Sequence, residues 1–215
     1  MLNKLSSIRK ALSCKALRAH SSCNIYISDS ANISCDGDSW VKLSRNCHLH
    51  LHENANVATS GRYVFGRGCT IIVHKNGNLI LGNESWALHD CWIEVGADET
   101  ISIGDRVTMQ LRCSIHGSVL IGDDVLMAPD VFISSGGHSF DKDNYLSIRE
   151  QDKLYNISKP VVIGSNSWLG IRSWIAPGVC LAEGTITGAN SVITKNTEMY
   201  SVYAGIPAVK IRSYR

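Results

Sequence analysis

Hydrophobic positions recur along this chain at a constant interval of about 22 residues, a length typical of repeat architectures. Four cysteines keep that spacing, at Cys47, Cys69, Cys91 and Cys113. An aliphatic residue follows each cysteine by two positions, at Leu49, Ile71, Ile93 and Ile115. A further apolar column precedes each cysteine by four positions, at Leu43, Phe65, Ala87 and Met109. The repeat indicates a stack of similar coils, each burying the same columns of side chains.

A shorter period of six residues appears inside the first from residue 101 onward. The first position of each unit is aliphatic and the fifth is small or β-branched, as in Ile103-Gly104-Asp105-Arg106-Val107-Thr108. Each unit predicts a short strand with its aliphatic residue pointing inward, followed by a bend made by the Gly-Asp or Gly-Ser pair. Three units make one coil, and successive coils would stack with parallel strands about 4.8 Å apart.

The repeat is interrupted once, after Val131. Ile133 and Ile163 keep the phase of the repeat, but the stretch between them is far longer than one unit. About 24 residues are therefore inserted, roughly over 137–159, and their polar composition predicts an exposed loop. Long loops inside a compact domain are usually functional or disordered.

Charge is unevenly distributed along the chain, although the net charge is only +2. The segment 1–22 has no acidic residue and carries Lys4, Arg9, Lys10, Lys15 and Arg18. Apolar residues recur there at helical spacing, at Leu2, Leu5, Ile8, Leu12 and Ala16. We expect a short amphipathic helix over 1–22. Two interpretations stay open: the helix packs on the open end of the stack, or it is attracted to an anionic membrane surface or an acidic polymer.

Composition excludes several classes of protein. No apolar run approaches the roughly 20 residues of a membrane-spanning helix, and the N-terminus lacks the apolar block of a signal peptide. A cytoplasmic location is the expectation, at the inner face of the membrane if the basic leader binds there. Nothing predicts nucleic-acid binding. The eight cysteines lack zinc-site spacing and are expected to be reduced core residues, with disulfides in an oxidising compartment as the lesser alternative.

The six-residue units resemble those of the hexapeptide-repeat acyltransferases, and within that family the sugar and polysaccharide O-acetyltransferases. The resemblance is strong over residues 101–212 and weaker over 25–100. It rests on Pro160-Val161-Val162-Ile163-Gly164, Ser167-Trp168-Leu169-Gly170, Ala176-Pro177-Gly178-Val179, Gly188-Ala189-Asn190-Ser191-Val192-Ile193-Thr194-Lys195 and Ala204-Gly205-Ile206-Pro207-Ala208.

That resemblance implies an all-β fold, a left-handed parallel β-helix shaped as a triangular prism of hexapeptide coils. The left hand is supplied by the family, because general packing rules favour right-handed crossovers. The expected organisation is a helical cap over 1–22, a β-helix over 23–200 with one long inserted loop, and a C-terminal extension over 201–215.

The resemblance also implies the site. The inserted loop opens with Gly136-Gly137-His138, where the family places a catalytic histidine. We expect His138 to act as general base, because a neutral imidazole can take the proton of a sugar hydroxyl. Trp168 and Gln110 match acceptor-side positions. The remaining histidines are expected on a solvated face or without a role: His20, His48, His50, His52, His74, His89 and His116.

The donor implied by the resemblance is acetyl-CoA, with no metal and no acyl-enzyme. Positions matching the coenzyme A site are Gly170, Ile171, Ala189, Lys195 and Arg212. In this assignment the backbone amide near Ile171 would stabilise the oxyanion, and Lys195 and Arg212 would contact the nucleotide phosphates. Family members are typically homotrimers with shared sites, so a homotrimer acting on a sugar or glycan acceptor is the expectation.

Three other functions remain open at this point. An acyltransferase of the same fold could act on an amino sugar or on serine. A metal hydratase of the γ-carbonic-anhydrase type would need three histidines around zinc, such as His89, His116 and His138, whose spacing departs from that family's pattern. A non-catalytic β-solenoid would bind no coenzyme A.

Overall fold

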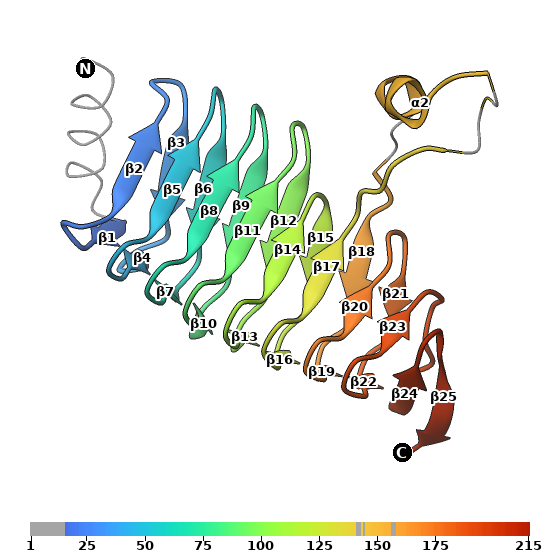
Figure 1. Cartoon of the computed structure of the whole chain (residues 1–215). Helices are drawn as coiled ribbons and strands as arrows, with labels where there is room; N and C mark the ends of the chain where they lie inside the picture. The colour runs from blue at the N-terminus through green and yellow to red at the C-terminus, as the bar shows by residue number, and fades with distance from the viewer. Residues whose placement is uncertain (1–15, 141–142, 144, 156–157) are drawn as a thin grey trace.

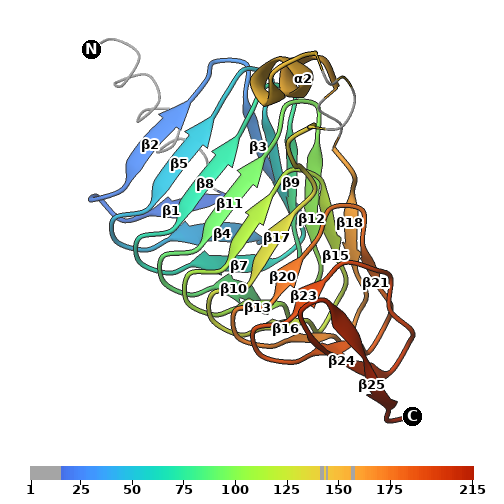
Figure 2. The ribbon, with the colours of Figure 1, turned by 45° about the vertical axis from the view of Figure 1, so that its right-hand side comes forward.

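The computed structural model of the protein describes residues 16–140, 143, 145–155 and 158–215. The chain winds as a left-handed parallel β-helix, and its turns stack into a three-sided prism (Figures 1 and 2). Each turn contributes one strand to each of three parallel sheets, here named sheets A, B and C. The predicted fold class is confirmed.

The three sheets run the length of the prism. Sheet A comprises β1 (Leu17–Ala19), β4 (Trp40–Leu43), β7 (Arg62–Phe65), β10 (Ser85–Ala87), β13 (Thr108–Met109), β16 (Leu126–Met127), β19 (Trp168–Leu169), β22 (Ile186–Thr187), β24 (Ser201–Gly205) and the antiparallel β25 (Ala208–Ser213). Sheet B comprises β2 (Asn24–Ile27), β5 (His48–Leu51), β8 (Thr70–Val73), β11 (Trp92–Val95), β14 (Ser114–His116), β17 (Phe132–Ser134), β20 (Trp174–Ile175) and β23 (Val192–Ile193). Sheet C comprises β3 (Asn32–Cys35), β6 (Asn56–Thr59), β9 (Asn78–Leu81), β12 (Thr100–Ile103), β15 (Val119–Ile121), β18 (Val161–Ile163) and β21 (Cys180–Leu181).

The core is a single narrow column in which the repeated hydrophobic positions point inward. Along β8, for example, exposure alternates so that Ile71 and Val73 are buried while Thr70 and Ile72 are partly exposed. This alternation is the expected consequence of side chains projecting to opposite faces of a strand. The columns recognised in the sequence are therefore the inner faces of the three sheets.

The cysteine ladder lies inside this core, as expected. All four ladder thiols are buried, and the described cysteines form no disulfide. Each thiol reaches a backbone carbonyl in the next coil, with Sγ to O distances of 2.9 Å from Cys69 to Leu88 and 2.9 Å from Cys91 to Gln110. The ladder thus adds a weak hydrogen bond between successive coils to the packing of small apolar side chains.

In the Gly-Asp units the glycine does not occupy the left-handed position of the bend. The left-handed backbone conformation occurs two residues later, for example at Arg106 and Asp124, with φ of 54° and 57°. Gly104 is needed because a Cβ there would lie 2.7 Å from the carbonyl carbon of Gly122 in the next coil. The prediction that the Gly-Asp pair bends the chain holds for Asp105, which lies in the turn with Arg106, whereas the glycine permits close stacking of coils.

Both expectations about helices need revision. Most of the helix predicted over 1–22 lies outside the described residues, and the described part, 16–22, contains strand β1. The insertion, expected as a loop, carries helix α2 (Ile148–Tyr155), which stands off the prism beside the edge between sheets B and C (Figures 1 and 2). Among the described residues, no helix has the length and apolar character required to cross a bilayer.

Candidate active site

The two ends of the insertion are hydrogen-bonded to each other where they join the prism. It departs after β17 and returns to β18, at the edge between sheets B and C. There the hydroxyls of Ser135 and Ser158 lie 2.7 Å apart, and the Lys159 N–H donates to the Ser135 carbonyl at 2.8 Å. Ser135 is fully buried, and its Oγ also accepts the Ser118 N–H at 2.7 Å. The chain that carries His138 therefore starts from a rigid base.

Helix α2 is held in place by its own cap and by one buried side chain. The Ser147 hydroxyl donates to Glu150 Oε2 at 2.6 Å, and the Ser147 N–H donates to the same oxygen at 2.9 Å. The Glu150 N–H donates in return to the Ser147 hydroxyl at 3.3 Å, so the two residues form a capping box, a sequence signature that the insertion contains as Ser-x-x-Glu. Gln151 is buried, donating to the Leu146 carbonyl and accepting the Asp143 N–H. The helix is consequently anchored to the loop that precedes it.

His138 and Asp152 meet inside the insertion. The Nδ1 atom of His138 lies 3.0 Å from Oδ2 of Asp152, whose other oxygen accepts the Ser139 N–H at 3.3 Å. The imidazole is 81% exposed, whereas the Asp152 side chain is only 24% exposed. When Nδ1–H donates to the carboxylate, Nε2 carries the free lone pair and faces solvent. A histidine held in this way can act as a general base.

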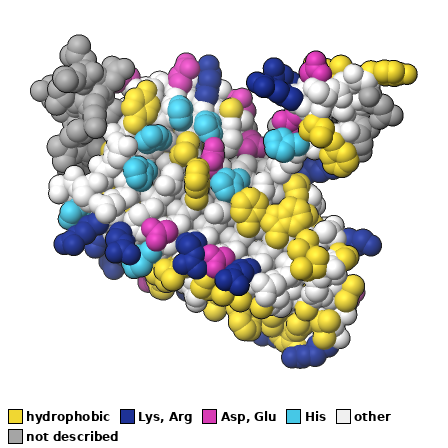
Figure 3. Space-filling model, viewed as in Figure 1, with side chains coloured by type: hydrophobic (Ala, Val, Ile, Leu, Met, Phe, Trp, Pro, Cys, Tyr) yellow, Lys and Arg dark blue, Asp and Glu magenta, His cyan; other side chains and the backbone are white. Residues whose placement is uncertain are grey.

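An open groove of about 770 Å³ begins at His138 and runs along the outer face of sheet B at its border with sheet C. Its lining includes His74, Glu94, His116, Ser134 and His138, from successive coils. Glu94 bridges two of the histidines, with distances of 2.9 Å to Nε2 of His74 and 3.6 Å to Nδ1 of His116. Figure 3 shows histidine side chains gathered over this face. His74 was expected only on a solvated face, and its place in the groove was missed.

The groove is polar and has no strong positive charge. Lysine and arginine are absent from the described residues that line it, whereas Glu94 and Glu99 are present. Burial lowers the pKa of His116, although the Glu94 carboxylate opposes that effect. The His116 ring stacks on Phe132, with centroids 5.3 Å apart. Hydrogen-bonding groups beside an aromatic surface are suited to a sugar bearing hydroxyls.

The other predicted site residues lie elsewhere on the chain. The corner between sheets A and B carries Gln110, Gly170, Ile171 and Ala189, while Trp168 projects from sheet A and is 52% exposed. Lys195 follows β23 at the edge between sheets B and C, and Arg212 belongs to β25. Within one chain, the structure thus separates His138 from Gly170, Ile171 and Ala189, whereas Lys195 lies on the same edge as His138, two strands further along sheet B.

The corner between sheets A and B still has features that suit a narrow ligand. A Cβ on Gly170 would lie 2.5 Å from the Thr187 carbonyl, so glycine is required there by coil stacking. Within the described part of the chain, the backbone N–H groups of Ile171 and Ala189 have no acceptor. Both residues are exposed, so this corner offers two outward hydrogen-bond donors one coil apart.

The three histidines considered for a metal are not brought together. His89 is exposed at the corner between sheets A and B, where Nδ1 accepts the Arg67 N–H at 3.1 Å. His116 and His138 lie on the other side of sheet B. Over the described residues, no group of three histidine, cysteine, aspartate or glutamate side chains has the geometry of a metal site.

Comparison with known proteins gives concordant results, although no protein-family model matches the chain. The galactoside O-acetyltransferase of Escherichia coli K12 is 30% identical over 156 residues, 70% of this chain and 74% of that protein. The putative lipopolysaccharide biosynthesis O-acetyl transferase WbbJ of the same strain is 31% identical over 163 residues, 70% and 82% of the respective chains.

The polySia-specific acetyltransferase NeuO, a solved structure, has the same fold. It superposes with a TM-score of 0.57 at 19% identity, covering 92% of this chain and 85% of its own. The similarity to the two curated relatives extends over most of their length. The chain belongs to the hexapeptide-repeat O-acetyltransferases.

Proposed function

We propose that this protein transfers an acetyl group from acetyl-CoA to a hydroxyl of a sugar or cell-surface polysaccharide, with His138 as general base. The observation that carries the proposal is the contact of His138 Nδ1 with Asp152 at the mouth of the groove. Both relatives described above are named O-acetyltransferases, one for galactosides and one in lipopolysaccharide biosynthesis. A cytoplasmic site of action is part of this proposal.

His138 would act on the acceptor. Its Nε2 atom takes the proton from the sugar hydroxyl as the oxygen attacks the acetyl carbon of the thioester substrate. The negative charge of Asp152 stabilises the imidazolium that forms, in the way a carboxylate supports a catalytic histidine. The proton then passes to the departing thiolate of coenzyme A, so the products are the free thiol and the acetylated sugar. The cysteine ladder takes no part, because its thiols are buried.

The donor half of the site would come from a second copy of the chain. In one chain, Ile171 and Ala189 lie across sheet B from His138, at the corner between sheets A and B. A homotrimer with shared sites would place that corner of one prism against the His138 edge of the next. The outward N–H groups at this corner would then hold the thioester oxygen, and Lys195 and Arg212 would contact the nucleotide phosphates.

The acceptor half would be the groove together with the partner's Trp168 and Gln110. Glu94, His74 and His116 offer acceptors and donors for sugar hydroxyls beside the Phe132 ring. Since the lining contains two glutamates and neither lysine nor arginine among the described residues, the sugar that reacts here is expected to be uncharged. The insertion closes one end of this groove.

The test of the base is acetyl transfer to a panel of glycans, followed by mass spectrometry. We expect His138→Ala to lower kcat/KM at least about 10²-fold, because general-base catalysis typically contributes that much or more. The matched control is His48→Ala, which removes an exposed imidazole on sheet B outside the groove. Near-full activity of His138→Ala, with the same circular dichroism spectrum, would remove His138 from the mechanism.

The shared site has its own test by subunit mixing. Ala189→Trp would obstruct the donor corner on the surface without disturbing the core, because Ala189 is exposed. Neither His138→Ala nor Ala189→Trp should be active alone. Co-expression should restore part of the activity, because some sites would combine the intact halves of two chains. Absence of any recovery in verified mixed trimers would show that each chain forms its site alone.

A further inference from the structure

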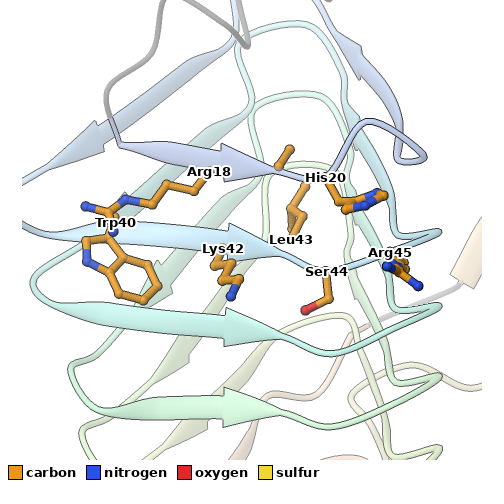
Figure 4. A pocket seen from close by; sticks show the side chains of 8 residues that line it. Arg18, His20, Trp40, Lys42, Leu43, Ser44 and Arg45 are labelled. Carbon is orange, nitrogen blue, oxygen red and sulfur yellow. The ribbon is translucent and has the colours of Figure 1, made fainter.

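A second concave site lies at the amino-terminal end of the prism, over strands β1 and β4 of sheet A. It has a volume of about 710 Å³ and is lined principally by Arg18, His20, Trp40, Lys42, Ser44 and Arg45. Figure 4 shows these side chains projecting from the outer face of the first described coils. Along sheet A, β4 and β16 are four strand spacings apart. Strand β16 belongs to the same coil as β17, the strand that precedes His138. At about 4.8 Å per step, the pocket is about 19 Å along the axis from the His138 coil.

The charge in this pocket is unbalanced. Its lining contains Arg18, Lys42 and Arg45 and has no acidic residue. Across the described residues, none of these three side chains forms a salt bridge. Arg18 and Lys42 are direct register partners on adjacent parallel strands, so their side chains project to the same face. Like charges placed opposite one another on a sheet are destabilising, and a bound anion would relieve that repulsion.

Trp40 orients one of these charges. The Arg18 guanidinium carbon lies 4.5 Å from the centroid of the Trp40 ring. A guanidinium stacked on an aromatic face keeps its in-plane N–H donors available, and those donors match the two oxygens of a carboxylate or phosphate. The Lys42 ammonium group can approach the same anion from the next strand. The pocket therefore has the elements of an anion site, with one guanidinium held in advance by stacking.

We propose that this pocket binds a carboxylate- or phosphate-bearing sugar. Arg18, Lys42 and Arg45 line one hollow, which suits a discrete group that enters it, whereas attraction to a membrane requires only basic residues spread over a surface. The pocket also contains the Ser44 hydroxyl, the His20 imidazole and the indole of Trp40. These neutral groups suit the hydroxyls and apolar face of a sugar ring. Binding here does not depend on acetyl transfer, because the pocket lies outside the His138 groove.

The experiment is calorimetric titration of the full-length protein at low salt. The probes are trigalacturonate and glucose 1-phosphate, with maltotriose as the neutral comparison. We expect the two acidic probes to bind and the neutral one to bind at least about tenfold more weakly, a difference of about 1.4 kcal/mol. The double variant Arg18→Gln/Lys42→Gln should weaken acidic binding at least about tenfold. The matched control Lys75→Gln removes a lysine paired with Glu53 outside the pocket and should bind as the unaltered protein does.

Two further measurements distinguish this pocket from the catalytic groove and from a membrane-binding surface. His138→Ala should bind the acidic probes unchanged, and a loss there would assign the binding to the catalytic groove and overturn the proposal. If the double variant does not fold, Arg45→Gln, at an exposed corner position, replaces it with the same expectation. Equal binding of maltotriose would refute an anion site. Binding only to vesicles containing phosphatidylserine, with no response to soluble sugars, would establish a membrane surface instead.

Discussion

The Nδ1 atom of His138 lies 3.0 Å from Oδ2 of Asp152, and both residues belong to the single insertion in an otherwise regular prism. The histidine comes from the outgoing segment and the aspartate from helix α2. The insertion therefore carries the proposed base together with the carboxylate that contacts it, and under this proposal catalysis requires an ordered α2.

Replacing Asp152 by asparagine should lower kcat and leave KM for acetyl-CoA unchanged. The amide keeps the size of the side chain but cannot stabilise an imidazolium, while the proposed donor corner lies elsewhere. The loss should be smaller than the roughly 10²-fold or more expected for removal of the base itself. Steady-state kinetics at several acetyl-CoA concentrations measures both constants.

The matched control is Asp143→Asn, in the same insertion. Asp143 Oδ1 accepts the Tyr145 N–H at 2.9 Å, and an amide oxygen can accept the same bond. This variant should have unaltered kinetics. Equal kcat values for the Asp152 and Asp143 variants would show that the His138 contact is not used in transfer.

Removing the cap of α2 should affect the site without affecting the prism. Ser147→Ala eliminates the hydroxyl that pairs with Glu150, and loss of such a cap typically costs about 1 kcal/mol of helix stability. Amide hydrogen exchange should accelerate within α2 and stay unchanged in the sheets. Activity should fall because α2 positions Asp152.

Ser147→Thr is the restoring control, since threonine keeps the capping hydroxyl that donates to Glu150. It should return both the exchange rates and kcat towards those of the unaltered protein. A variant with rapid exchange in α2 but full activity would separate helix order from catalysis and contradict the positioning role.

Replacing one cysteine of the ladder by alanine should destabilise the fold. Cys91 is buried, and its thiol donates to the Gln110 carbonyl. Cys91→Ala leaves that carbonyl without its partner and creates a small void, which together should lower the free energy of unfolding by about 1–3 kcal/mol. Equilibrium unfolding in urea gives the value. Cys180→Ala, at an exposed position, should stay within about 0.5 kcal/mol.

Stability should also fall at alkaline pH because of this ladder. The hydrogen bond with the Cys113 thiol, followed by burial, raises the pKa of Cys91 from 9.0 to about 12. The unfolded chain therefore loses this proton at lower pH than the folded one, so the stabilisation is full below pH 9.0 and is lost as pH rises towards 12. Between pH 8 and pH 10, the free energy of unfolding measured in urea should decline less in Cys91→Ala than in the unaltered protein. An identical decline in both proteins would contradict the role of this thiol.

Much of the fold was predictable because a solenoid repeats its packing in the sequence. The spacing from Cys69 to Cys91 equals one turn, so equivalent positions could be aligned without structural information. The interrupted phase between Ile133 and Ile163 located the insertion for the same reason. The bends were harder to assign, because the left-handed positions are occupied by Asn, Asp and Arg as well as by Gly.

The site was less accessible from the sequence. Asp152 reaches His138 only through the path of the insertion, which follows no repeat, although the Ser147-x-x-Glu150 signature could have revealed α2. The relation of Glu94 to His116 was available, since one full turn separates them along the chain and they are register partners.

The prism is wider at one end than at the other, and this limits how the protein can lengthen in evolution. Tyr63 pairs with Ser85 at an offset of 22 residues, whereas Thr108 pairs with Leu126 at an offset of 18 residues. A duplicated copy of the longer turn, inserted between Cys69 and Cys91, would stack between two turns of its own length. The same copy placed after Leu126 would be too long for its neighbours and would have to bulge outward. Gain or loss of whole turns is therefore expected on the amino-terminal side of the catalytic coil, where the reach of the molecule can change while its chemistry is preserved.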